Sequence, residues 1–158
     1  MNLKELIEKY SILQKKYSLP GFDELNSAFD IGKIRRDSGN LIRDIRRMMI
    51  EKIVYYLKLI EVIMNPSQAS PIFMMLLKDI NPNDLKIMDS LLSPFVELEL
   101  KAHKLDVYST EKEESQLVSR IFNCWVSKRS ELGELITVLE RNWSQIKSVP
   151  KKSRDYFS

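Results

Sequence analysis

The sequence predicts an all-α fold: a single domain, built as a mainly antiparallel bundle of four to five main helices with one or two short helices. Apolar residues recur every three or four positions through most of the chain, which is the spacing of one helix face. No segment alternates apolar and polar residues as a half-buried strand does, and no hairpin dipeptide occurs. No repeat with a period of about 20–50 residues is present, which argues against a helical solenoid.

At 158 residues the chain has the size of one domain. We expect that domain to span residues 1–148, and the basic segment 149–158, which lacks periodicity, to be a flexible tail. The charged N-terminus contains no apolar secretion signal, and no apolar run is long enough to cross a bilayer. A single cysteine cannot form an internal disulfide, which fits a reducing compartment. These observations predict a cytoplasmic protein without a membrane contact.

The first helix is predicted from Leu3 to Tyr17. Asn2 can cap its N-terminus, and Glu5 can return a hydrogen bond to the Asn2 backbone. A Leu-Pro-Gly sequence follows and ends the helical spacing. Residues 22–29 predict a short helical turn. The basic stretch 32–39, with glycine at both ends, predicts a loop or a weak helix.

A long helix is predicted from Asn40 to Met64, where an Asn-Pro pair ends it. Ser70 and Pro71 then form a helix-start signal, an N-cap followed by proline at the first helical position. The segment 72–80 is strongly apolar, so we expect a short buried helix there.

The next long helix is predicted from about Pro82 to Val107. Its apolar residues recur at seven-residue intervals in two series, which is an a/d-like stripe. The series are Met88, Phe95 and Ala102, and Leu91, Leu98 and Leu105. We expect Leu98 to be buried. Pro94 predicts a kink, because proline cannot donate the backbone hydrogen bond of a regular helix.

The last periodic segment, 111–147, begins after a capping box formed by Thr110 and Glu113. Its unbroken phase favours one long helix, whereas Gly133 and nearby serines favour two helices with a bend. Trp125 lies on the apolar stripe. We therefore expect Trp125 to be buried, and its replacement by alanine to cost about 3–5 kcal/mol if the site is fully packed.

Residue types that most enzyme chemistry requires are nearly absent. The chain has one histidine, His103, one cysteine, Cys124, and four glycines. A single histidine cannot supply the ligands of a di-iron bundle, and the Glu99–His103 pair is expected to be a surface contact on one helix. Cys124 lies in an apolar helical stretch, where cysteine is usually an inert small hydrophobe. No glycine spacing matches a phosphate-binding loop. We therefore predict no catalytic residue, no metal and no cofactor.

The small net charge of +3 conceals one local cluster of basic residues. The cluster consists of Arg35, Arg36, Arg43, Arg46 and Arg47. Such a row can contact phosphates or an acidic partner, because guanidinium groups form paired hydrogen bonds with phosphate. We favour a solvated helix face paired locally with Asp44 or with glutamates on a neighbouring helix. Hydroxyl, glycine and aromatic residues, which usually accompany a nucleic-acid site, are sparse there.

The methionines offer a second candidate surface. Methionine-rich grooves accept varied partner helices, and Met48, Met74 and Met75 are the candidates for a docking surface. Methionine at helical spacing more often fills a core, which is the interpretation we favour.

The predicted function is a non-enzymatic protein–protein interaction module, a scaffold or adaptor whose partner is a protein. The first alternative is a nucleic-acid-binding protein that uses the basic cluster at 35–47. A weaker alternative is a helical bundle that binds a small ligand or hydrolyses a substrate between its helices. The identity of the partner and the oligomeric state do not follow from the sequence.

Overall fold

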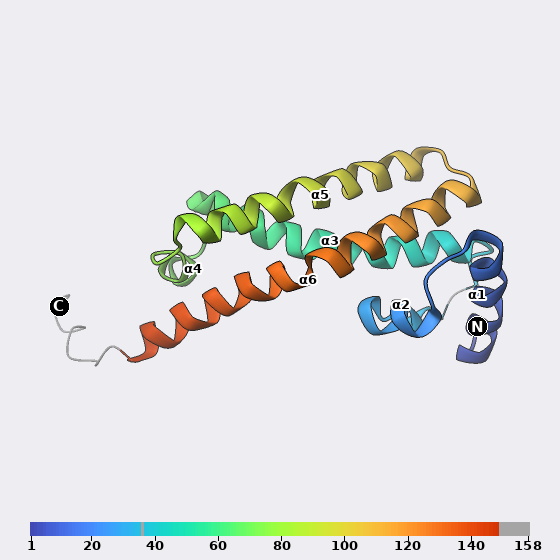
Figure 1. Ribbon diagram of the computed structural model, residues 1–158, viewed down its shortest axis with the longest axis horizontal. Helices are drawn as coiled ribbons and strands as arrows, with labels where there is room; N and C mark the ends of the chain where they lie inside the picture. The colour runs from blue at the N-terminus through green and yellow to red at the C-terminus, as the bar shows by residue number, and fades with distance from the viewer. Residues whose placement is uncertain (36, 149–158) are drawn as a thin grey trace.

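Three long helices make up most of the molecule (Figure 1). They are α3 (Leu41–Met64), α5 (Pro82–Val107) and α6 (Glu111–Ser148). α5 runs antiparallel to both α3 and α6, and each of the three contacts the other two. The computed structural model describes residues 1–35 and 37–148, so the predicted tail at 149–158 lies outside the described residues.

The shorter elements lie toward the two ends of this bundle (Figure 1). At one end are α1 (Leu3–Tyr17), α2 (Phe22–Phe29) and the 3-10 turn η1 (Ile31–Lys33). At the other end the connection from α3 to α5 contains the 3-10 turn η2 (Pro66–Gln68) and α4 (Pro71–Leu76). Within the described residues there is no strand, and the predicted all-α bundle of four to five main helices with one or two short helices is confirmed. The main helices are α1, α3, α5 and α6, and the short ones are α2 and α4.

The helices begin at the predicted capping residues. Asn2 Oδ1 accepts a hydrogen bond from the Glu5 backbone N–H, and the Glu5 carboxylate accepts one from the Asn2 N–H. Thr110 and Glu113 make the same reciprocal pair before α6. These bonds satisfy N–H groups that have no partner within the helix, and so they fix where each helix starts.

The core follows the apolar stripes of the long helices. The two predicted series of α5 are buried, and Leu98, at 5% exposed, confirms its expected burial. α3 contributes Ile42, Ile45, Met49, Ile53, Leu57, Ile60 and Ile63 to the same core. Burial of this kind contributes roughly 25 cal/mol per Å2 of apolar surface, which makes it the main stabilising term.

Pro94 does not end α5, which continues as a helix on both sides of this residue.

α6 is one continuous helix of 38 residues, about 57 Å long, which decides between the two predicted alternatives. Gly133 does not interrupt it. One face of the helix is buried in the core at Leu117, Val118 and Ile121, and again at Leu132 and Leu135. From residue 122 to residue 131, by contrast, no side chain is fully buried. This stretch of α6 borders the cleft described below.

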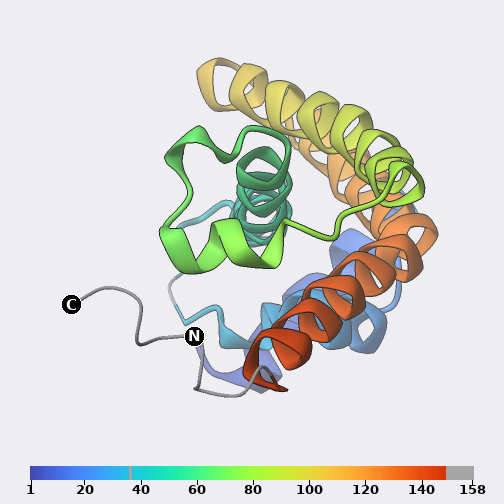
Figure 2. The ribbon, with the colours of Figure 1, turned by 90° about the vertical axis from the view of Figure 1, so that its left-hand side faces the viewer.

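The short helix predicted at 72–80 is present as α4, but its predicted burial is wrong. α4 is a helix of only six residues, and none of them is buried. Ile72 is 60% exposed. Figure 2 shows the reason: α4 lies across the end of the bundle, so the long helices pack against only part of it. Apolar composition alone does not bury a segment that no neighbouring element covers.

Candidate functional site

The predicted arginine cluster is largely an internal ion-pair network that joins α3 to the α5–α6 hairpin. Arg46 is 1% exposed, and its Nε donates to Glu114 Oε2 at 2.8 Å. The Glu114 side chain is fully buried. Arg46 also donates to Asp106 Oδ1 at 2.7 Å. Each buried charge therefore faces an opposite charge, which offsets the large cost of removing it from water.

The neighbouring arginines use the same carboxylates. Arg43 Nε donates to Glu114 Oε1 at 3.1 Å and its Nη2 donates to the Ser109 hydroxyl at 2.8 Å. Arg47, which is half-exposed, donates to Asp106 at 3.1 Å. The favoured interpretation is a solvated helix face that pairs locally. Pairing with a glutamate of a neighbouring helix describes the contacts of Arg43 and Arg46, but the face is not solvated at Arg46, which is buried.

The prediction of a phosphate or acidic-partner contact is wrong for Arg46. This residue cannot contact an external group, because it is buried and its guanidinium group donates to Glu114 and Asp106. Arg35 donates to the backbone carbonyl of Gly32 at 2.6 Å. Arg36 lies outside the described residues. Asp44, the other expected partner, accepts a hydrogen bond from Ser38 instead.

The network lowers the pKa of two carboxyl groups, those of Glu114 and Asp106. Burial alone would raise the pKa of Glu114, but the hydrogen bonds from Arg46 and Ser109 and the Arg46 charge lower it below its ordinary value. For Asp106, the hydrogen bond from Arg46 is the main cause of a lowered pKa. Both groups therefore remain ionised in the folded protein under mildly acidic conditions.

We expect the free energy of unfolding to fall on acidification. A carboxylate whose pKa is lowered by folding stabilises the protein above its ordinary pKa, which is 4.5 for Glu114 and 3.8 for Asp106. That contribution is lost as the pH falls through the lower pKa of the folded state. Urea unfolding at a series of pH values from about 7 down to about 3 measures the decline.

A matched pair of variants assigns this decline to the network. Glu114→Gln should make the pH dependence shallower. Glu134→Gln removes an exposed carboxylate of α6 outside the network, so the slope should barely change. If both variants had the same slope as the wild-type protein, the buried network would not be its source.

The structure separates the candidate methionines. Met48 is half-buried against the core in the first half of α3, about 24 Å along that helix from Met64. Met74 and Met75 lie on α4 and are 43% and 42% exposed. The three methionines therefore do not form one docking surface. Met74 and Met75 share the exposed α4, and Met48 lies apart from them on α3. The exposed apolar residues at the α4 end of the bundle are Met64, Ile72, Met74, Met75 and Leu85.

The remaining candidate residues for chemistry, His103 and Cys124, lie on different helices, α5 and α6. His103 is exposed and lies 3.6 Å from the Glu99 carboxylate on the same face of α5. Burial raises the pKa of the Cys124 thiol, which reduces its thiolate fraction. The described part of the chain contains no group of three His, Cys, Asp or Glu side chains that could hold a metal ion.

Among residues 1–35 and 37–148, no helix has the length and apolarity needed to cross a membrane.

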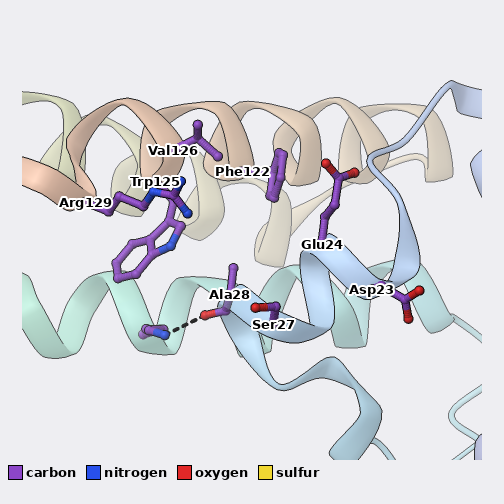
Figure 3. Close-up of a pocket in the computed structure, with 9 residues that line it drawn as sticks. Asp23, Glu24, Ser27, Ala28, Phe122, Trp125, Val126 and Arg129 are labelled. Carbon is purple, nitrogen blue, oxygen red and sulfur yellow. Dashed lines mark hydrogen bonds between the residues drawn. The ribbon is translucent and has the colours of Figure 1, made fainter.

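An open cleft of about 730 Å3 lies where α2, α3 and α6 meet. Phe122, Trp125 and Val126 of α6 form one side of it, and Ala28 of α2 lies opposite (Figure 3). Val126 is 45% exposed, whereas Phe122 and Trp125 are partly buried. The burial predicted for Trp125 is therefore only half correct: the ring packs on the core with one part and lines the cleft with another.

Aromatic rings and one ammonium group hold Trp125 in place. Its ring centroid lies 5.5 Å from that of Phe29 and 5.8 Å from that of Tyr56. The Lys52 ammonium lies 4.6 Å from the Trp125 ring centroid and donates to the Ala28 carbonyl at 2.5 Å. A cation over an indole face is attracted by the ring quadrupole, and aromatic pairs at these distances attract one another. The tryptophan is thus presented to the cleft in a defined orientation.

The ends of the cleft carry opposite charges. Asp23 and Glu24, from the first turn of α2, lie at one end, and Arg129 of α6 lies at the other, beside Trp125 (Figure 3). All three side chains are exposed. Among the described residues, none of them has an ion-pair partner within 4.0 Å, although Glu24 accepts the Gly21 backbone N–H at 2.9 Å. The cleft therefore combines an apolar middle with charges that are available to a ligand.

The cleft was not predicted from the sequence, although one signal was present. Phe122, Trp125, Val126 and Arg129 are spaced i, i+3, i+4 and i+7, which places them on one helix face. That face adjoins the core face and shares Trp125 with it, whereas Val126 and Arg129 lie outside the core stripe. The contribution of α2 had no sequence signal, because it depends on how the chain folds back onto α6.

Comparison with known proteins does not identify a relative: no family model, no curated protein and no solved structure matches the chain. The all-α fold does not itself indicate a function, because such folds host many functions, and the residues of the site are the remaining guide.

Proposed function

We propose that the chain is a non-enzymatic helical interaction module that binds a protein partner in the cleft between α2 and α6. The observation that carries the proposal is the partly exposed Trp125, which lines an open cleft and is held by Phe29, Tyr56 and Lys52. Tryptophan and arginine are the residues most enriched among those that dominate binding energy at interfaces. Both border this cleft.

The cleft has the layout of a protein-binding site. Its middle is apolar and its rim is charged, which is the usual arrangement of an interface. Trp125 is already ordered by its neighbours, so a partner does not have to immobilise it on binding. An accessible apolar side chain, Val126, extends the contact area beyond the tryptophan.

Selection of peptides from a random library tests this proposal while the natural partner is still unidentified. Helical peptides of about 18 residues are selected on the wild-type protein and then measured on variants. Binding should be lost on Val126→Glu, because the apolar face of the peptide would bury the new carboxylate. Val126 is 45% exposed, so this variant should fold normally, which its thermal unfolding will verify.

The matched control changes the other exposed apolar surface. Met74→Ser combined with Met75→Ser makes the α4 end polar and should leave binding unchanged. Peptides that bind Val126→Glu as well as the wild-type protein, or that are lost only on the α4 variant, would contradict the cleft as the docking site.

A further inference from the structure

The charge arrangement of the cleft restricts the partner further, and this inference rests on the function proposed above. Along α6, Phe122 precedes Arg129 by seven residues, so the apolar stretch and the arginine extend over about 10 Å. The carboxylates of Asp23 and Glu24 lie at the Phe122 end, away from Arg129 (Figure 3). Two turns of a partner helix therefore match the length of α6 from Phe122, at the carboxylate end, to Arg129.

We propose that the cleft binds one amphipathic α-helix of a protein partner whose apolar face covers Trp125 and Val126. At one end of this helix, basic side chains lie over Asp23 and Glu24. At its other end, an acidic side chain lies over Arg129. The partner segment thus carries opposite charges about two turns apart on the side of its apolar face.

Charge complementarity supports this occupant over an uncharged one. An uncharged helix would leave the three rim groups without opposite charges, whereas a helix with charges of both signs matches both ends of the cleft. A strongly anionic ligand such as a nucleic acid would meet repulsion from Asp23 and Glu24. Lys52 does not alter this balance at the ends, because its ammonium lies over the Trp125 ring and donates to Ala28.

Two synthetic peptides of the same length and apolar face test the inference. Each has about 18 residues with leucine and alanine on one face. The dipolar peptide carries lysines at one end of that face and glutamates two turns away, and the neutral peptide carries glutamine at all of these positions. Binding is followed by the emission of Trp125 in a Trp143→Phe background, in which it is the sole remaining tryptophan.

The dipolar peptide should bind about tenfold more tightly than the neutral peptide, because each matched rim contact contributes modestly. This preference should disappear at about 1 M NaCl, where exposed charges are screened. Arg129→Glu should weaken the dipolar peptide and leave the neutral peptide unchanged. The matched control is Lys58→Glu, which makes the same charge change at an exposed position of α3 outside the cleft and should affect neither peptide.

The outcomes separate this inference from the proposed function. If both peptides bind equally well, and both are lost on Val126→Glu, the cleft is a docking site without charge selection and the inference is overturned. If neither peptide changes the Trp125 emission, both proposals fail. Self-association of the wild-type protein that Val126→Glu abolishes, with neither peptide bound, would assign the cleft to a second copy of the chain and would also overturn the inference.

Discussion

Replacement of Arg46 by alanine is expected to lower the free energy of unfolding by about 3–5 kcal/mol. The guanidinium group is 1% exposed and pairs with Glu114, whose side chain is fully buried. Its removal deprives the Glu114 carboxylate of its closest charge partner and leaves a gap between α3 and the α5–α6 hairpin. Urea unfolding at about pH 7 measures the loss.

Arg47→Ala is the matched control. Arg47 is the next residue on α3 and pairs with Asp106, but its side chain is 53% exposed, so its removal should cost no more than about 1 kcal/mol. A second variant, Arg46→Met with Glu114→Gln, removes the buried charges together and should regain much of the stability lost in Arg46→Ala. Equal losses in Arg46→Ala and Arg47→Ala would refute the buried network as a stabilising feature.

Trp125→Ala is expected to have the second-largest effect, and to act on both stability and binding. Because the ring is only partly buried, the loss of stability should be about 2 kcal/mol, below the cost for a fully buried tryptophan. Binding of peptides selected on the wild-type protein should fall by about 30-fold or more, as for a central interface tryptophan.

The other tryptophan of the chain provides the control. Trp143 is 39% exposed on α6, and Lys147 lies over its ring at 5.2 Å. It is about 27 Å along the helix from Trp125, so Trp143→Ala should leave peptide binding unchanged and cost no more than about 1 kcal/mol. A loss of binding in Trp143→Ala that equalled that of Trp125→Ala would contradict the position of the site.

The long helices could be predicted because their signals are local. The stripe of α5, from Met88 to Leu105, has both the spacing and the residue types of a buried face, and it is buried. Capping residues such as Asn2 and Thr110 act within four positions of their partners, so they mark helix starts without tertiary information. α4 could not be placed in the same way, because its exposure depends on which other elements reach the end of the bundle.

The site could be predicted only in part, because it is assembled from distant segments. Pairing of the arginines with a glutamate on a neighbouring helix was expected, but the complete burial of Arg46 follows from the position of Glu114 on α6. The cleft requires α2 to lie against the middle of α6, which brings Glu24 and Arg129 to the ends of one surface. No spacing within either segment encodes that arrangement.

Methyl and indole NMR of the protein with the dipolar peptide tests most directly whether the cleft is the docking site. We expect the largest shifts at the Val126 and Ala28 methyl groups and at the Trp125 indole N–H, with little change at the Met74 and Met75 methyl groups. Shifts concentrated on α4, or spread evenly over the molecule, would contradict a docking site in the cleft between α2 and α6.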